Sequence, residues 1–161
     1  MKFTEKDRAY MRIAMEMARK GVESGQSPFG ACIVNGNGKV IAQAHNEVVR
    51  NTDVTAHAEV QAIRLACRAV NSIDLSGCTI YSTCEPCPMC FAACHWAKLD
   101  RVVYGASIKD AQGAGFNEMT ISNLQMRELG GSSVEVDGGC LSEENESVFR
   151  AYIGLPNRIV Y

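Results

Sequence analysis

The chain has 161 residues, of which 47% are hydrophobic and 21% charged, so we expect one globular domain over residues 1–161. A formal net charge of −2 excludes a general electrostatic preference for nucleic acid or anionic membranes. No apolar run approaches the length of a membrane span, and the first eight residues are too charged for a signal peptide. We therefore expect a cytoplasmic protein.

Hydrophobic periodicity and turn residues predict the elements of the first half of the chain. Apolar residues at helical spacing predict a helix over residues 4–21, with Thr4 as its N-cap. Strands are predicted over residues 29–34 and 40–45, because the turn sequence Asn35-Gly36-Asn37-Gly38 separates two apolar runs. These features predict a helix followed by a β-hairpin.

Helices and strands alternate in the rest of the chain. Residues 46–55 are expected to be irregular. The next helix, residues 56–70, is expected to be buried along Val60, Ile63, Cys67 and Val70. The remaining expected elements are a strand at 78–82, a helix at 88–98, a strand at 101–105, a loop at 107–117, a weak helix at 120–129, a strand at 133–136, a helix at 142–153 and an irregular tail at 154–161. This alternation predicts a three-layer α/β domain.

Two short motifs carry the residues suited to metal chemistry, Thr55-Ala56-His57-Ala58-Glu59 and Thr83-Cys84-Glu85-Pro86-Cys87-Pro88-Met89-Cys90. Cys87 and Cys90 are three residues apart at a helix start, so one turn brings both sulfurs to the same side. His57 precedes the other predicted helix. We interpret these three residues as zinc ligands. Three protein ligands leave a fourth tetrahedral position open, which is typical of catalytic zinc.

Glu59 follows His57 by two residues and is interpreted as the group that moves protons. Bound zinc lowers the pKa of water to about 7, and a neighbouring carboxylate can act as general base and then general acid. The pattern His-x-Glu followed by Pro-Cys-x-x-Cys is typical of zinc-dependent nucleobase deaminases. A non-catalytic zinc scaffold would have no use for Glu59.

The chain has eight cysteines, and their spacing allows two other interpretations of the motif, an iron–sulfur cluster and a closed structural zinc site. The spacing of Cys84, Cys87, Cys90 and Cys94 matches that of bacterial iron–sulfur ferredoxins, although His95 stands where that motif has proline. A closed structural zinc site could also recruit Cys84 or Cys94 as a fourth ligand. Without an export signal we expect the cysteines to be thiols or metal ligands.

The sequence resembles the cytidine/deoxycytidylate deaminase superfamily over nearly its whole length, and within it most resembles bacterial guanine deaminases and plant guanosine deaminases. The matching segments are Pro28-Phe29-Gly30-Ala31, His57-Ala58-Glu59-Val60, Cys84 to Cys90, Trp96-Ala97 and Ala114-Gly115-Phe116. The resemblance implies an α/β/α cytidine-deaminase-like fold with a mixed five-stranded sheet. It also implies one Zn²⁺ per subunit and a homodimer with active sites near the subunit interface.

The same resemblance implies a set of substrate contacts. Asn46 matches an amide that hydrogen-bonds a purine, and the backbone at Ala58 matches a second contact. Phe29 and Trp96 match the walls around a flat base. Tyr161 matches a terminal tyrosine that takes part in the site when the tail, residues 154–161, caps it.

One position departs from the family pattern. Guanine deaminases carry two aspartates after Gly-Phe, the second placed to hydrogen-bond the base, and this chain has Asn117 and Glu118 there. The resemblance thus implies that Glu118 contacts the substrate. Glu118 keeps the charge on a side chain one methylene longer. The resemblance implies deamination of an amino-substituted nucleobase, guanine to xanthine with release of ammonia. Guanosine, cytosine, another aminopurine or an aminotriazine is the alternative substrate.

A tRNA adenosine deaminase, which forms inosine, is the nearest competing function because it shares the metal motif. Holding an RNA stem usually needs a basic surface. After Asp100 the chain has only five lysines and arginines against eight aspartates and glutamates. This balance favours a small-molecule substrate over nucleic acid.

Overall fold

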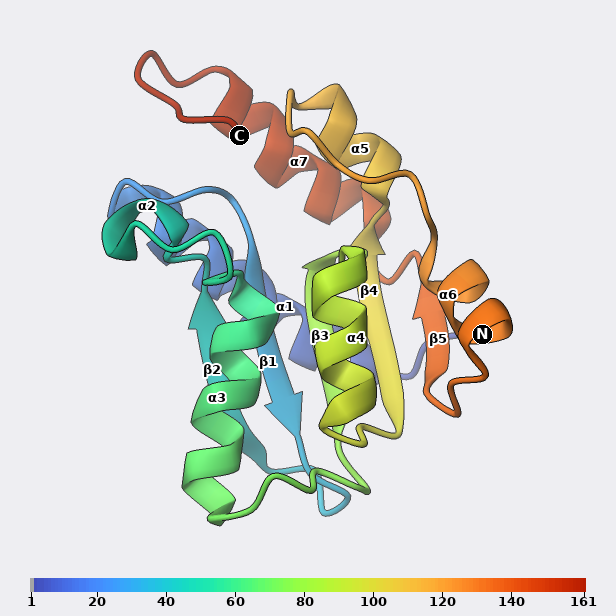
Figure 1. The fold of residues 1–161 in the computed structure, drawn as a ribbon. Coiled ribbons are helices and arrows are strands. Elements are labelled where there is room, and N and C mark those ends of the chain that lie inside the picture. Colours follow the sequence, from blue (N-terminus) through green and yellow to red (C-terminus); the bar gives the residue numbers. More distant parts are fainter. Residues whose placement is uncertain (1) are drawn as a thin grey trace.

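A computed structural model describes residues 2–161 and contains a five-stranded sheet in the order β2-β1-β3-β4-β5 (Figure 1). The strands are β1 (Gly30–Val34), β2 (Val40–His45), β3 (Thr79–Cys84), β4 (Arg101–Ala106) and β5 (Glu135–Gly138). β1 pairs antiparallel with β2 and β3, whereas β3, β4 and β5 run parallel. The expected mixed five-stranded sheet is confirmed.

Helices cover both faces of the sheet, which gives the three expected layers (Figure 1). The helices are α1 (Glu5–Glu23), α2 (Val48–Asn51), α3 (Ala58–Val70), α4 (Pro88–Trp96), α5 (Ile108–Gly113), α6 (Asn123–Gly130) and α7 (Ser142–Ile153). One apolar core joins the sheet to α3 and α4, and a second joins its other face to α1 and α7. None of the helices in residues 2–161 combines the length and apolarity that crossing a bilayer requires.

The face that α3 buries differs from the predicted one. Ala58, Ala62 and Ala66 are fully buried against the sheet, while Val70 is 44% exposed and Val60 only half-buried. Alanine has the smallest side chain that still favours a helix, so this stripe lets the helix lie close to the strands. Of the predicted face, Ile63 and Cys67 are partly buried and pack against the same core, so the predicted face is turned by only about one residue position around the helix.

Two short helices occupy segments expected to be irregular. α2 lies within residues 46–55, and α5 lies within residues 107–117. Ser107 and Asp110 form a reciprocal capping box at the start of α5. This serine and acidic residue, three positions apart, was the available signal for a helix start.

The fold gathers the motif residues at one end of the sheet. β3 and β4 end there, and α3 and α4 begin there with His57 and Cys87 as their N-caps. α2, α5 and the C-terminal tail lie at the same end (Figure 1). Loops beyond the carboxyl ends of parallel strands are a common place for ligand sites in α/β proteins.

A buried carboxylate joins α1 to the opposite end of the strands. Asp7 accepts hydrogen bonds from the Thr4 hydroxyl at 2.7 Å, from the Tyr81 hydroxyl at 2.8 Å and from Arg101 Nη1 at 2.8 Å. Burial alone would raise the pKa of Asp7, but these hydrogen bonds together lower it to about 2. Folding is therefore linked to the ionised form of this residue.

We expect Asp7→Asn to remove part of the acid sensitivity of the fold. A folded pKa of about 2 against an unfolded pKa of about 3.9 contributes roughly 2–3 kcal/mol above pH 5, lost as the pH falls toward 2. Urea unfolding of wild type and variant at pH 6 and pH 3 measures this difference. Glu16→Gln, at an exposed ion pair on α1, is the control. An equal loss of stability in wild type and Asp7→Asn would contradict the linkage.

Candidate metal centre and cavity

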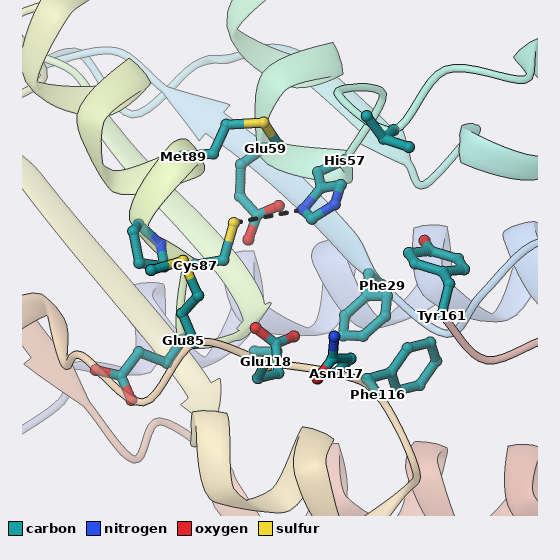
Figure 2. Close-up of a pocket in the computed structure, with 14 residues that line it drawn as sticks. Phe29, His57, Glu59, Glu85, Cys87, Met89, Phe116, Asn117, Glu118 and Tyr161 are labelled. Atoms are coloured by element: carbon teal, nitrogen blue, oxygen red, sulfur yellow. Dashed lines mark hydrogen bonds between the residues drawn. The ribbon is translucent and has the colours of Figure 1, made fainter.

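Three side chains from two helix starts converge at the end of the sheet. Nδ1 of His57 lies 3.6 Å from Sγ of Cys87 and 3.5 Å from Sγ of Cys90. Figure 2 shows the His57 ring directed at the Cys87 sulfur. Within residues 2–161, these three residues form the one group of histidine, cysteine or acidic side chains close enough to share a metal ion.

The spacing of the three donor atoms fits zinc. A zinc ion with Zn–S bonds of about 2.3 Å and Zn–N bonds of about 2.05 Å at tetrahedral angles holds nitrogen and sulfur about 3.6 Å apart. The two observed N···S distances agree with that value. One imidazole and two thiolates are also ligands that zinc prefers.

Neither alternative use of the cysteines is supported by this geometry. Cys84 lies 3.5 Å from the carbonyl oxygen of Ser107 and is not part of the metal group, and neither is the fully buried Cys94. Among the described residues, no fourth protein ligand therefore completes either a cluster of four cysteines or a closed zinc site. The group has the three-ligand form of catalytic zinc sites.

The electrostatics of the group favour metal binding through Cys87. A hydrogen bond with Cys90, together with His57, lowers the pKa of Cys87 to about 4 against the opposing effect of burial. The pKa of Cys90 is raised by its hydrogen bond with Cys87 and by burial. Burial alone would lower the pKa of His57, but Cys87 and the charge of Glu59 raise it overall. The surroundings therefore favour the thiolate form of Cys87, which is the form that binds a metal.

Glu59 lies beside the three ligand residues and outside their group. Its Oε1 accepts a 2.9 Å hydrogen bond from the Ser82 hydroxyl, and its Oε2 is 3.5 Å from Cys90 Sγ. The side chain is buried, and burial is the main reason that its pKa is raised. Ser82 on β3, to which sequence reasoning gave no role, therefore fixes the orientation of this carboxylate.

A cavity of about 470 Å³ opens directly over the metal group (Figure 2). It is lined by Phe29, Val54, His57, Glu59, Cys84, Glu85, Cys87, Pro88, Met89, Phe116, Asn117, Glu118, Met119 and Tyr161. The metal ligands and Glu59 lie on one side, and the rings of Phe29, Phe116 and Tyr161 lie on the other. Mostly apolar walls around a few polar groups suit a flat, partly polar ligand.

The C-terminal tail forms part of this cavity. The amide N–H of Asn117 donates to the carbonyl oxygen of Tyr161 at 2.9 Å, and the Tyr152 hydroxyl donates to the carbonyl oxygen of Ile159 at 2.6 Å. The Tyr161 ring packs edge-on against Phe116 with ring centroids 5.7 Å apart. The tail is thereby held against the wall segment that follows α5.

Asn46 and Ala58 are close to the cavity but do not line it. Asn46 is buried; its Nδ2 donates to the Tyr161 hydroxyl at 2.8 Å, and its Oδ1 accepts from the amide of Val48 at 3.0 Å. Ala58 is the first residue of α3 and is fully buried. Tyr161 therefore occupies the amide group that was expected to face a purine.

Trp96 is not brought to the cavity of its own chain, which corrects the expectation that it walls the site. It ends α4, the helix that begins at the metal group, and is 81% exposed. Its neighbour His95 instead hydrogen-bonds Ser132 at 2.9 Å. The helix carries the tryptophan away from the ligands at its other end.

Glu118 does line the cavity, as the resemblance implied. Burial, together with the negative charge of Cys87, raises its pKa to about 7, and His57 opposes that rise. Figure 2 shows its carboxylate directed into the cavity between the metal ligands and the aromatic rings. The longer side chain therefore still presents a carboxyl group to the ligand space.

Comparisons with known proteins agree with this geometry. The family model for the "cytidine and deoxycytidylate deaminase zinc-binding region" matches residues 4–106, which include every residue of the metal group. The guanine deaminase of Bacillus subtilis (strain 168) is 44% identical over 113 residues, covering 70% of this chain and 72% of that protein. The resemblance to bacterial guanine deaminases is thus confirmed.

Two further relatives extend the comparison. The tRNA-specific adenosine deaminase of Bacillus subtilis (strain 168) is 38% identical over 146 residues, covering 91% of this chain and 88% of that protein. The structure of a guanine deaminase from Nitrosomonas europaea superposes with a TM-score of 0.85 at 28% identity, covering 92% of this chain and 85% of that one. The chain therefore belongs to the cytidine and deoxycytidylate deaminase family, with the α/β fold and the zinc-binding region of that family.

Proposed function

We propose that this protein hydrolyses the exocyclic amine of a free nucleobase and that its substrate is guanine. Water supplies oxygen to the amine-bearing carbon, the carbon–nitrogen bond breaks, and xanthine and ammonia result. The observation that carries the proposal is the cavity that joins the metal group and Glu59 to an aromatic wall closed by the tail. Similarity to two guanine deaminases supports the choice of base.

Each polar residue of the site has a separate role in the proposed reaction. His57, Cys87 and Cys90 would hold zinc. Bound zinc is a Lewis acid that lowers the pKa of water to about 7. Glu59 carries one proton of the attacking water to a ring nitrogen. Once the carbon–oxygen bond has formed, it carries the second proton from that oxygen to the leaving amine. Ser82 holds this carboxylate by Oε1, so that Oε2 faces Cys90 and the metal group, where the proton transfer would take place.

The walls would hold a planar base in one orientation. Phe29 and Phe116 form an edge-to-face pair with ring centroids 4.9 Å apart and leave an apolar surface toward the cavity. Glu118 would accept hydrogen bonds from the polar edge of the base. Asn46 would act through the Tyr161 hydroxyl to which it donates, and the backbone at Ala58 is the remaining contact that the resemblance implies.

An ammonia-release screen tests the substrate. The zinc-loaded protein is incubated with guanine, guanosine, adenine, cytosine, isocytosine and an aminotriazine, and the release of ammonia is measured for each. We expect guanine to have the highest kcat/KM. If recognition depends on the amine and carbonyl groups more than on the purine ring system, isocytosine will be the next best substrate. Greater turnover of guanosine or cytosine than of guanine would overturn the choice of base.

A tRNA adenosine deaminase is the second candidate, because a relative of that name matches 91% of this chain. Such an enzyme must admit a nucleotide that remains attached to its RNA strand. Here Tyr161 and the tail occupy one side of the cavity, which favours a free base. Inosine formation in tRNA, with no ammonia from any free base, would establish the second candidate and refute the first.

We expect removal of residues 159–161 to weaken substrate binding more than chemistry. The deletion removes the Tyr161 ring and its contacts with Asn46 and Asn117, but leaves the metal group intact. KM for guanine should rise up to about tenfold, since an aromatic pair contributes roughly 0.5–1.5 kcal/mol beyond the area that it buries. Steady-state ammonia release measures KM and kcat separately.

The control for this deletion is Arg158→Ala, an exposed tail residue whose hydrogen bond goes only to the Leu155 carbonyl oxygen. It should behave as wild type. An unchanged KM in the deletion variant would show that the tail does not take part in substrate binding.

We extend the proposal to the assembly and its setting: a cytoplasmic homodimer acting in purine metabolism. The exposed Trp96, at the end of the helix that begins at Cys87, supports a second chain packing on α4. In that arrangement Trp96 would lie against the neighbouring subunit and not beside the cavity of its own chain. Sedimentation of wild type and Trp96→Ala tests this extension.

A further inference from the structure

The wall of the cavity opposite His57 is a segment without regular secondary structure. Residues 114–122 connect α5 to α6 and contribute Phe116, Asn117, Glu118 and Met119 to the lining. Irregular segments of this kind depend on contacts with neighbouring elements for their position. What fixes this wall relative to the metal ligands is therefore important for any substrate.

One buried carboxylate contacts both helices that flank this segment. Oε1 of Glu85 accepts a 2.9 Å hydrogen bond from the amide of Asn123, the first residue of α6. Oε2 of the same side chain accepts a 3.4 Å hydrogen bond from the amide of Ile108, the first residue of α5. Glu85 thus binds the starts of two helices that lie on either side of residues 114–122.

Glu85 is also part of the loop that carries the metal ligands. It precedes Cys87 by two residues, and its own amide donates to the carbonyl oxygen of Ala106 at 2.8 Å. Asn123 Nδ2 donates in return to the carbonyl oxygen of Pro86 at 2.6 Å. Figure 2 shows the Glu85 carboxylate directed away from the metal ligands, so it is not placed to react with a substrate.

The two helices do not need Glu85 in order to begin. α5 has its own capping box, Ser107 with Asp110, and α6 has another, Ser122 with Gln125. Each box satisfies the amides of the N-cap and of the third helical residue, which leaves the amide of the first helical residue for Glu85. The additional effect of the carboxylate is to tie both helix starts to the metal-ligand loop.

We propose that Glu85 is a positioning residue that holds the cavity wall, residues 114–122, at a fixed distance from the metal ligands. The 2.9 Å hydrogen bond from the Asn123 amide to this buried carboxylate has the length of the stronger kind, whereas the 3.4 Å contact with the Ile108 amide is weaker. The burial of Glu85, 7% exposed, protects them from water. The consequence for the reaction rests on the proposed function, whereas the placement of the wall does not.

Three variants test the proposal. Glu85→Ala removes both contacts, and Glu85→Gln keeps one acceptor oxygen while placing an amide donor against the other N–H. Asp110→Ala is the matched control, because it breaks the capping box of α5 and leaves both Glu85 contacts in place. For each variant, zinc content, hydrogen exchange of the amides in residues 114–122, and KM and kcat for guanine are measured.

We expect Glu85→Ala to keep about one zinc per chain and to lose exchange protection across residues 114–122. Its kcat/KM should fall by up to about 100-fold, the cost that a misplacement of about 1 Å can have, and most of the loss should lie in KM. Glu85→Gln should fall between it and wild type, and Asp110→Ala should stay within a few-fold of wild type.

Several outcomes would overturn the proposal. Unchanged exchange protection in both Glu85 variants would show that the wall is held by other contacts. An equal rise of KM in Asp110→Ala would show that only helix capping matters. If Glu85→Ala does not fold, Glu85→Gln decides by the same measurements. If wild type does not deaminate guanine, the proposed function fails, and zinc content and exchange alone decide whether Glu85 holds the wall.

Discussion

Replacing Glu59 with glutamine is expected to abolish deamination while leaving the fold and the zinc site in place. Glutamine has the same shape and can still accept the hydrogen bond from Ser82, but it cannot carry the proton from water to the leaving amine. General acid–base catalysis by one positioned group typically contributes a factor of about 10²–10⁴. We therefore expect kcat for ammonia release from guanine to fall by at least about that factor.

Two measurements separate this effect from damage to the site. Elemental analysis should give the same zinc content in Glu59→Gln as in wild type, because Glu59 lies outside the group of three ligands. Glu23→Gln, at the exposed end of α1, is a control that should keep full activity. Undiminished turnover by Glu59→Gln would refute the proton-transfer role, whatever the metal content.

Ser82→Ala provides a graded version of the same experiment. The variant keeps the Glu59 carboxylate but removes the hydroxyl that donates to its Oε1. A carboxylate that can rotate spends less time in the productive orientation, so kcat should fall by less than in Glu59→Gln. Ser82→Thr keeps a hydroxyl and should restore part of the loss.

The metal group was predictable because its signals are local. Cys87 and Cys90 are one helical turn apart, and Pro88 between them predicts that the helix starts there, which α4 confirms. His57 likewise precedes a helix with clear periodicity. The spatial meeting of the two motifs then follows from the order of strands and helices, because both helices begin at one end of the sheet.

The walls of the cavity were less predictable because they depend on contacts between distant segments. Asn46 and Tyr161 are 115 positions apart in sequence, and no periodicity indicates that they share a hydrogen bond. Trp96 shows another limit. The family resemblance implied that it walls the site, but the geometry of the helix places it at the far, exposed end of α4, away from the cavity of its own chain.

Glu85 shows why a residue inside a recognised motif can still be passed over. The sequence analysis gave it no role, because its partners are the backbone amides of Ile108 and Asn123, which have no signature in the side-chain sequence. The glycines around α5 led us to expect a loop in that segment. The Ile108 amide was therefore not expected to stand at the start of a helix. Only the folded chain shows that the carboxylate links two helix starts.

Removing a single zinc ligand is expected to have the largest effect on the centre. Cys87→Ala, Cys90→Ala or His57→Ala leaves two of the three donors, and metal content should fall from about one zinc per chain to a small fraction of it. Activity should fall with it. Ligands bound in the deprotonated form also couple the metal to folding, so each variant should melt at a lower temperature than the zinc-loaded protein.

Cys94→Ala is the control that distinguishes an open site from a closed one. Cys94 lies on α4 one turn beyond Cys90, is fully buried, and stands outside the metal group. The variant removes a thiol of similar sequence spacing and should retain its zinc. Loss of zinc from Cys94→Ala would mean that a fourth cysteine closes the site, which would leave no open position for water and would contradict a catalytic centre. Zinc retained in Cys87→Ala at the wild-type level would contradict the ligand set itself.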